Sequence, residues 1–460
     1  MKLFKNIFSA FLFTLFLTSS SGAQNKKLKL EARQAMLKAT KYMVEKVSTN
    51  GGYVTYYLPD FSRRWGKLKA FYTQIWIQDP ATVSMGNIFL DAYTSTGDEY
   101  YYKAAEKVAD ALVWGQLPAG GWNYIVDFAG DRSLKKWYNK IGKNAWDFEE
   151  YNHYYGNATF DDLNTAEAAT FLLRIYLEKL DVKYNPVLDK VINFVLESQY
   201  TLEGWPQRYS LKYDYPHGEL EDYTSFCTFN DYVIWGNIQF LIQNYLTPGE
   251  EQFLEAIHRG MNFYLLTQQG NPQAGWGQQH DMMLKPAHSR TYEPSALMPS
   301  ATYDHAMLLL RFYQYTADQG YIARILDAIK WLESTRLIKE KAEDGKRTHP
   351  TFVEAETNKT IYAHGTGTGV VDGHYWWDYD DQNLPAHYGG KTTENIDKLK
   401  NEYESVLSLE PDELTKDHPL KVERFQGKTT PQKFYASIRT FSGEHTNEKK
   451  VKPIVNGLDR

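Results

Sequence analysis

Apolar residues recur along most of this chain at intervals of three and four positions, and strict alternation of apolar and polar residues is scarce. The first pattern is typical of amphipathic helices and the second of half-buried strands, so we predict a mostly helical protein. The predicted helices cover Lys27–Lys46, Ala81–Ser95, Glu99–Trp114, Asp162–Leu180, Pro186–Ser198, Asn230–Tyr245, Glu250–Gln268, Pro294–Thr316, Tyr321–Thr335 and Thr393–Leu407.

Three similar turns follow the third, fifth and seventh of these helices. Each turn begins near a glutamine and ends in a Gly-Trp pair, at Trp122, Trp205 and Trp276. A repeat of helix pairs with equivalent turns indicates stacked or ring-closed hairpins. We therefore predict an all-α fold, an (α/α) toroid or barrel of helical hairpins with long rim loops. The three tryptophans are expected to pack within the turns.

The domain organisation follows from composition. No linker interrupts the region from 27 to 340, so residues 24–410 are predicted to form one catalytic domain. This domain includes an aromatic, glycine-rich loop at 363–391, which has no helical period and is expected to fold back over the body. Residues 411–460 are predicted to be a polar C-terminal extension.

The N-terminus has the pattern of a secretory signal peptide. Lys2 and Lys5 precede an apolar run that is too short to span a bilayer, and small residues end at Ala23. We expect residues 1–23 to be cleaved and the protein to be secreted or periplasmic, with no membrane span. The single cysteine, Cys227, excludes an internal disulfide and is expected to be buried.

The net charge of −6 argues against nonspecific nucleic-acid binding, although a local basic cleft can coexist with an acidic exterior. Aromatic residues make up 15% of the chain, and many lie in loops. Their rings could stack on sugars or pack long loops against helices, and composition leaves both interpretations open.

The richest chemistry lies between Gln268 and Ser295. Proton carriers and cations crowd together there, namely His280, Asp281, Lys285, His288, Arg290 and Tyr292. A structural loop has no need of so many, whereas an enzyme that handles an acidic sugar does.

Four blocks along the chain carry a family resemblance: Glu203–Tyr209, Thr228–Asp231, Gly275–Asp281 and Arg290–Glu293. In order and spacing they resemble the helical pectate lyases of polysaccharide lyase family 10, over roughly residues 80 to 335. The resemblance implies β-elimination on a uronate polymer.

Two departures bear on the substrate. The chain adds an N-terminal block, Tyr56–Asp79, and the aromatic tail, and it lacks an obvious acidic cluster for the calcium that those pectate lyases use. Its length and its Arg-x-Tyr sequence look more like the glucuronan and alginate lyases of family 38. Glucuronan or alginate is therefore the expected substrate, and a calcium-dependent pectate lyase is the alternative. No metal ligands or cofactor are assigned, and calcium remains open.

Elimination requires a group that neutralises the uronate carboxylate, a base, and an acid for the leaving oxygen. We predict Tyr292 as base and acid, with Arg290 tuning it or gripping substrate. His280 follows a turn and is expected to reach the rim as a second base or carboxylate contact. Asn230 is the predicted neutraliser, and Asp231 the predicted helix cap.

Further residues are predicted to contact the polymer. Gln207 and Arg208 lie in the turn after Trp205, and Gln279 lies just before His280. His153 and Asn157 lie in a polar aromatic loop, and Arg64 and Trp65 lie in a basic segment that could form a lid. The expected partner is an acidic polysaccharide, and the expected state is a monomer. The sequence does not specify the linkage, endo or exo action, or syn or anti elimination.

Three other functions fit the sequence less well. A glycoside hydrolase on the same fold would use paired carboxylates such as Asp161 and Asp162, which look like an ordinary helix cap. A triterpene-type cyclase matches only short motifs. A non-catalytic glycan-binding protein would not need the cluster between residues 280 and 292.

Overall fold

The computed structural model describes residues 26–145, 148–210, 220–247, 251–338, 347–368, 371–384, 390–416 and 418–421. The predicted signal peptide and nearly all of the predicted C-terminal extension lie outside these residues. Within them, no helix is both long enough and apolar enough to cross a membrane.

Helices form the body of the molecule, as the periodicity predicts. Residues 26–42 are helical and continue into a π-helical turn, Met43–Val47. The remaining α-helices are α2 (Thr82–Thr96), α3 (Glu99–Gly115), α4 (Asp131–Lys140), α5 (Asn164–Lys179), α6 (Asn185–Glu197), α7 (Val233–Leu246), α8 (Glu251–Thr267), α9 (Pro299–Thr316), α10 (Ile325–Ser334), α11 (Ile396–Leu407) and α12 (Pro411–Leu414).

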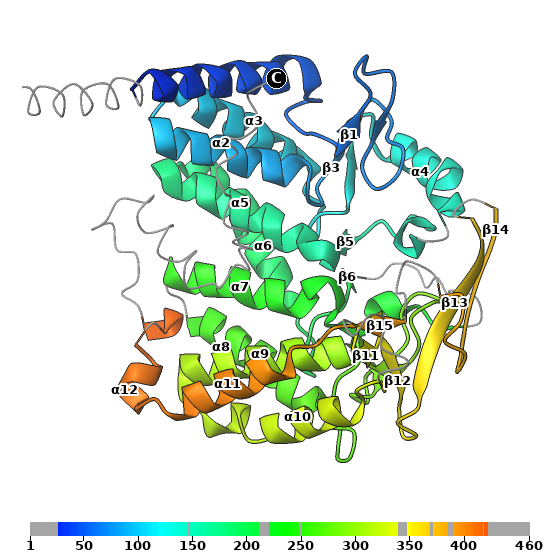
Figure 1. Cartoon of the computed structure of the whole chain (residues 1–460). Helices are drawn as coiled ribbons and strands as arrows, with labels where there is room; N and C mark the ends of the chain where they lie inside the picture. The colour runs from blue at the N-terminus through cyan, green and yellow to red at the C-terminus, as the bar shows by residue number, and fades with distance from the viewer. Residues whose placement is uncertain are drawn as a thin grey trace, which may run out of the picture.

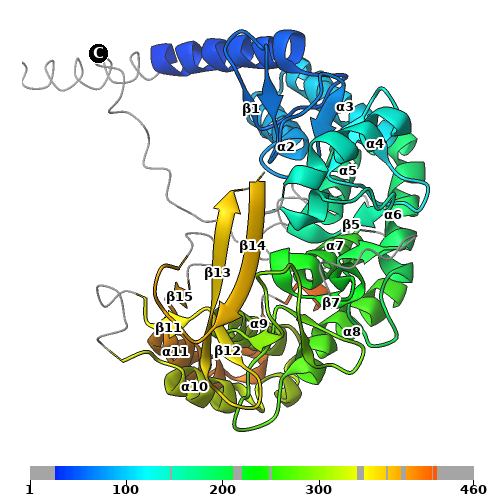
Figure 2. The same ribbon diagram turned by 90° about the vertical axis from the view of Figure 1, so that its right-hand side faces the viewer.

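These helices form successive hairpins that follow an arc around the molecule (Figures 1 and 2). The prediction of an all-α fold of helical hairpins is confirmed for the body. Helix α4 is not among the predicted helices, because its apolar positions are few and most of its residues are charged or polar.

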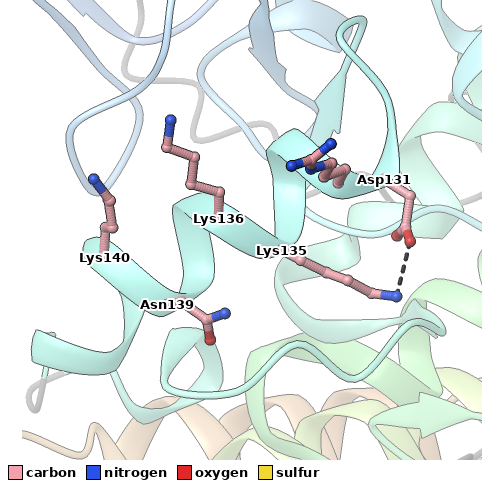
Figure 3. A pocket seen from close by; sticks show the side chains of 6 residues that line it. Asp131, Lys135, Lys136, Asn139 and Lys140 are labelled. Atoms are coloured by element: carbon pink, nitrogen blue, oxygen red, sulfur yellow. Dashed lines mark ion pairs between the residues drawn. The ribbon is translucent and has the colours of Figure 1, made fainter.

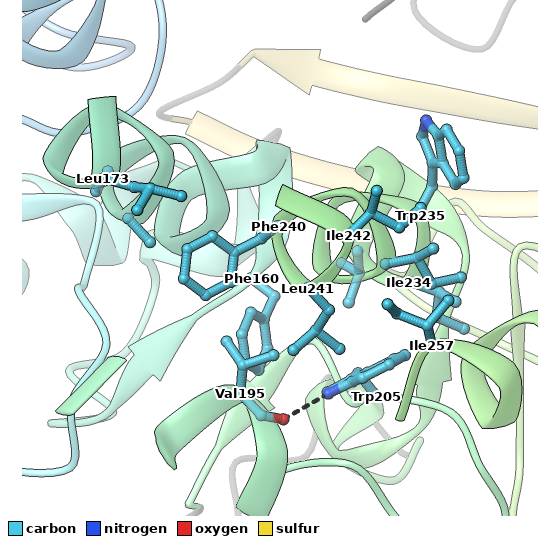
Figure 4. Packing of buried hydrophobic residues seen from close by; sticks show 14 of the residues in the cluster. Phe160, Leu173, Val195, Trp205, Ile234, Trp235, Phe240, Leu241, Ile242 and Ile257 are labelled. Atoms are coloured by element: carbon cyan, nitrogen blue, oxygen red, sulfur yellow. Dashed lines mark hydrogen bonds between the residues drawn. The ribbon is translucent and has the colours of Figure 1, made fainter. Parts of the chain in front are cut away.

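The predicted Gly-Trp turns are one motif used three times. Trp122, Trp205 and Trp276 are fully buried. Each donates its indole N–H at 2.8 Å to a backbone carbonyl in the last turns of the helix before it, namely that of Leu112, Val195 or Tyr264. Figure 4 shows the bond from Trp205 to Val195. The interpretation of these tryptophans as turn-packing residues is confirmed.

Short strands gather at one end of the helices, where Figure 1 shows the connecting loops. They were not predicted, because most contain only two or three residues. They are β1 (Tyr56–Tyr57) with β2 (Arg64–Trp65), β3 (Gln74–Trp76) with β4 (Ile125–Asp127), β5 (Ala158–Thr159) with β6 (Arg208–Tyr209), β7 (Cys227–Thr228) with β8 (Gln279–His280) and β9 (Pro286–Ala287), and β11 (His349–Pro350) with β15 (Lys391–Thr392).

The aromatic segment forms a β-hairpin. A four-stranded antiparallel sheet runs in the order β10 (Ala296–Leu297), β12 (Phe352–Glu354), β13 (Thr360–Thr368) and β14 (Val371–Asp378). In Figure 2 the β13–β14 hairpin lies on the inner side of the arc, over the end where the loops gather. The expectation that this segment folds back over the body is confirmed.

The inner helices α5 and α7 begin later than predicted, for the same local reason. Asp162 and Leu163 have φ of 51° and 59°, and Asp231 and Tyr232 have φ of 51° and 59°. Non-glycine residues seldom adopt this left-handed conformation, which costs about 1–3 kcal/mol each. Two equivalent turns carry this strain, and each presents an aspartate at the loop end of the molecule.

Candidate active site

Arg290 lies at the centre of a group of carboxylates. Its guanidinium is 3.1 Å from Glu150 Oε2 and 3.3 Å from Glu293 Oε2, and it is 3.6 Å and 3.8 Å from oxygens of Asp161 and Asp231. Burial opposes the charge of Arg290, but Glu150, Tyr292 and Glu293 raise its pKa well above the usual value. Arg290 therefore remains a cation and ties together loops that are far apart in the sequence.

Lys67 supplies a second cation to the same group. Its Nζ is 2.6 Å from Asp162 Oδ2 and 3.9 Å from Glu150 Oε1. Burial opposes its charge, but Glu150, Asp162 and Asp161 raise the pKa of Lys67. We call Lys67, Glu150, Asp161, Asp162, Asp231, Arg290 and Glu293 together the carboxylate cluster.

The aspartates of the cluster differ in protonation. Burial disfavours the charge of Asp161, but Arg290 and Lys67 outweigh it and lower its pKa. Burial, then the charges of Asp161 and Asp162, raise the pKa of Asp231 well above its usual value. A hydrogen bond joins the Asp161 and Asp231 carboxyl groups, so Asp231 is placed to remain protonated and donate to Asp161.

Only part of the carboxylate cluster reaches solvent. The side chains of Glu150, Asp161 and Glu293 are at most 1% exposed, whereas those of Lys67, Asp162 and Asp231 are 31%, 29% and 27% exposed. These three side chains form the face of the cluster that a ligand can meet first.

Asn230 lies beside this face. It is half-buried, its amide donates to Glu293 Oε1 at 3.4 Å, and its carbonyl oxygen accepts from Gln278 at 3.4 Å. The amide predicted to neutralise a substrate carboxylate is thus next to the cluster, and its role stays a prediction.

Asp231 is not the helix cap that the sequence suggested. The turn Asn230–Tyr232 has no side-chain cap, because the left-handed backbone at Asp231 directs its carboxyl toward Asp161 and Arg290 instead of the helix N–H groups. The same correction applies to Asp161 and Asp162, which also make no cap and both belong to the cluster.

Tyr292 is close to Arg290 but covered. The guanidinium of Arg290 interacts electrostatically with the Tyr292 phenol, and a nearby cation favours a phenolate. Tyr292 is 2% exposed, and its ring lies 4.6 Å from the ring of Tyr375 on β14. The hairpin therefore contributes to the surroundings of the predicted base.

The expectation that His280 reaches the rim is wrong. His280 is fully buried on the central strand of the β7–β8–β9 sheet, and neither ring nitrogen has a hydrogen-bond partner among the described residues. Burial lowers its pKa to about 3. His280 is a neutral core residue, because pairing of β8 on both sides turns its ring toward Phe229.

Several predicted substrate contacts are structural in this conformation. Arg208 is fully buried between the rings of Tyr124 and Tyr155, and it donates to Asn157 Oδ1 at 3.4 Å. Gln279 is also buried, and it donates to the backbone of Ala287. In this conformation both side chains are out of reach of a polymer, and their hydrogen bonds support the loops.

The residues of the predicted lid have two different roles: Arg64 fixes the segment to its neighbours, and Lys67 contacts the carboxylate cluster. Arg64 is buried and donates to Thr49 Oγ1 at 2.6 Å and to the carbonyl of Gln74 at 2.8 Å. Trp65 is half-buried beside it. Lys67, from the same basic segment, is the residue that reaches the cluster.

The remaining predicted contacts lie near the cluster without forming its exposed face. Gln207 is buried and donates to Asp161 Oδ1 at 3.0 Å, so it orients that carboxylate. His153 is half-buried, with its ring 6.3 Å from that of Tyr155.

Sequence reasoning missed Glu150 and Glu293 and gave Asp161 no part in the site. The repeat itself could have signalled the aspartates, since Phe160-Asp161-Asp162 and Phe229-Asn230-Asp231 occupy equivalent positions before inner helices. Nothing local marks Glu150, whose partner Arg290 is 140 residues away.

A separate basic hollow of about 530 Å³ lies along α4. Four cationic side chains line it, with Asp131 and Asn139 (Figure 3): Arg132, Lys135, Lys136 and Lys140. Lys135 pairs with Asp131 at 2.8 Å.

The fold and the cluster define an enzyme built from helical hairpins, with its ionisable groups on the loops at one end. The pectic acid lyase family model matches residues 127–365, slightly more than half of the chain. The chain belongs to that family and is a polysaccharide lyase.

Solved structures similar to this chain include two of a family 10 polysaccharide lyase from Cellvibrio cellulosa. One matches with 18% identity over 70% of this chain and 98% of that chain, with a TM-score of 0.46. The other, a D189A mutant in complex with trigalacturonic acid, matches with 17% identity over 71% and 98%, with a TM-score of 0.45. A cellobiose 2-epimerase from Spirochaeta thermophila matches with 11% identity over 71% and 75%, with a TM-score of 0.42. No curated protein matches the sequence.

Proposed function

We propose that this protein cleaves polygalacturonate by β-elimination at the exposed face of the carboxylate cluster. The observation that carries the proposal is the pectic acid lyase match over residues 127–365, which spans the segments that supply Arg290, Asn230 and the clustered aspartates. The same match favours pectate over glucuronan or alginate, which the chain length had suggested.

The chemistry requires three groups around a uronate residue. A base removes the proton on the carbon beside the C6 carboxylate, and the electron pair of that C–H bond becomes the new C4=C5 double bond. The C4–O4 bond breaks, and the departing O4 takes a proton. Masking the carboxylate charge makes the first proton acidic enough to remove.

We assign these roles to residues at or beside the cluster. Asn230 masks the carboxylate by donating its amide. Tyr292 takes the proton and returns it to O4, and the positive charge of Arg290 favours its phenolate. Tyr375 covers Tyr292 in this structure, so this assignment requires the hairpin ring to move aside or to form one wall of the bound sugar.

Calcium, which the resemblance to the family implies, has a poor set of ligands here. Asp162 already accepts from Lys67 and Gln78, and Asp231 shares its hydrogen bond with Asp161. Among the described residues, no group of three or more His, Cys, Asp or Glu side chains is arranged to hold a metal ion. No step of the mechanism above passes through a metal.

The hollow on α4 supports an anionic polymer as substrate. Its four cations could attract a polyuronate electrostatically, which raises the rate of encounter rather than the rate of chemistry. Secretion to the medium or periplasm is likewise proposed from the signal-peptide pattern, and mass spectrometry of the exported protein would reveal whether it begins at Gln24.

The test is ultraviolet absorbance of the conjugated uronate product. Purified protein is incubated with polygalacturonate, glucuronan, polymannuronate and polyguluronate, each with calcium and with chelator. A rise on polygalacturonate supports the proposal, and a rise only on another polymer reassigns the substrate. New reducing ends without absorbance would contradict elimination and direct attention to the clustered carboxylates as hydrolytic groups.

A further inference from the structure

Lys67 enters the carboxylate cluster from a segment that the family match does not include. The match begins at residue 127, whereas Lys67 belongs to the additional N-terminal block. Its ammonium nevertheless contacts Asp162 at 2.6 Å across 95 residues of sequence. Gln78, from the same block, donates to the same carboxylate oxygen.

The block is built to hold Lys67 in this position. Gly66 packs against the Trp76 ring so closely that a Cβ there would come within 2.1 Å of it. The turn is closed by a hydrogen bond from Gly66 N to Leu68 O at 3.0 Å. Arg64 fixes the strand before the turn, and β3 pairs with β4 after it. Lys67 is therefore held in position by a well-packed turn.

The exposed donors of Lys67 are suited to a second anion. An ammonium group has three N–H donors, and Asp162 is its one hydrogen-bond partner among the described residues. With 31% of the side chain exposed, the ammonium forms part of the accessible face beside Asp162 and Asp231. A substrate carboxylate can therefore bind Lys67 without breaking a buried contact.

We propose that Lys67 is a substrate-contacting residue that pairs with the uronate carboxylate and occupies the cation position beside Asp162. This inference rests on the proposed function. According to this inference, Lys67 works with Asn230 to neutralise the charge of the substrate carboxylate. Lys67 and calcium then compete for the same position beside Asp162. The ammonium supplies the positive charge, so elimination proceeds in chelator.

The test compares Lys67→Met and Lys67→Arg with Lys69→Met, an exposed lysine two residues further along the same segment. For each protein, the rate on polygalacturonate is measured in chelator and during calcium titration. Binding of trigalacturonate is measured separately by calorimetry. Lys67→Met should lose on the order of 10²-fold in kcat/KM, as for removal of other charge-stabilising groups. It should also bind the trisaccharide about tenfold more weakly.

Lys67→Arg should recover most of the binding, because it keeps the charge, and Lys69→Met should match the wild type. Calcium should bind Lys67→Met more tightly than the wild type, because Asp162 then has no cation beside it among the described residues and keeps only the neutral donor Gln78. Wild-type activity that vanishes in chelator and returns with calcium would overturn the inference and leave the proposed function standing. Equal trisaccharide binding by the wild type and Lys67→Met would also overturn it, even if no polymer is cleaved. Activity absent on every polymer would instead count against the proposed function.

Discussion

Arg290 donates from Nε to Glu150 Oε2 at 3.1 Å, and both side chains are almost completely buried. The pair joins two loops that are 140 residues apart. A buried ion pair contributes little net free energy, but removing one partner is costly, because Arg290 then loses its nearest carboxylate in a buried site and, among the described residues, keeps only Glu293 and the more distant aspartates.

Glu150→Ala should therefore lower the free energy of unfolding by about 3 kcal/mol. The matched control is Glu106→Ala, which breaks the partly exposed Lys183–Glu106 pair at 2.6 Å and should cost less than about 1 kcal/mol. Urea unfolding of both variants measures the difference. An equal loss of unfolding free energy in both variants would mean that burial of Arg290 does not depend on its pairing with Glu150.

Tyr292→Phe should abolish turnover and leave polymer binding within a few fold of wild type. Only the phenol oxygen carries protons, and the ring that packs on Tyr375 is retained. Steady-state rates on polygalacturonate, with binding measured by calorimetry, provide the check. A near-normal kcat would exclude Tyr292 as the base.

Asn230→Ala should reduce kcat on the order of 10²-fold, as for loss of other donors that stabilise developing charge. Among the described residues, the side-chain amide hydrogen-bonds to Glu293 and Gln278, each at 3.4 Å, so its removal should affect stability much less than rate. Thermal unfolding and kcat are measured together. A lower melting temperature with normal kcat would assign Asn230 a structural role.

Trp377→Ala should raise KM about tenfold and leave kcat within about twofold, since an aromatic stack contributes about 0.5–1.5 kcal/mol. Trp377 is 39% exposed and lies two residues after Tyr375 on β14, hence on the same face of the hairpin. Trp114→Ala removes a ring that is 54% exposed on α3, and KM should then be unchanged. Identical KM values for both variants would show that the hairpin does not contact the sugar.

The stability of the protein should fall as pH is lowered from 6.5 toward 3. Burial lowers the pKa of His280 and of His305 to about 3 from an ordinary value of 6.5. Between these values the unfolded chain binds protons that the folded chain does not bind. Each histidine thus lowers the free energy of unfolding by up to about 1.4 kcal/mol per pH unit.

His280→Leu should remove about half of this pH dependence, because only His305 then takes up a proton on unfolding. The substitution breaks no hydrogen bond within the described part of the chain, since both ring nitrogens lack partners there. Urea unfolding at several pH values gives the slope. An unchanged slope in the variant would mean that His280 is protonated in the folded state.

The sequence by itself determined most of the helices, the three Gly-Trp turns and the enzyme class. These features depend on local periodicity and on short motifs whose spacing is visible in one dimension. It also placed Arg290, Tyr292 and Asn230 on the same loop end, because each follows a turn of the repeat. The helices predicted to begin at Asp162 and Asn230 begin later, since the left-handed residues at these turns have no sequence signal apart from the repeat.

Only the tertiary structure decided which charges meet. Lys67, Glu150, Asp231 and Arg290 come from four separate loops, and no local pattern relates them. Tertiary packing likewise buried His280 and Arg208, which local context had assigned to the rim. Burial and pairing of ionisable groups depend on neighbours brought together by the fold, whereas periodicity depends only on neighbours along the chain.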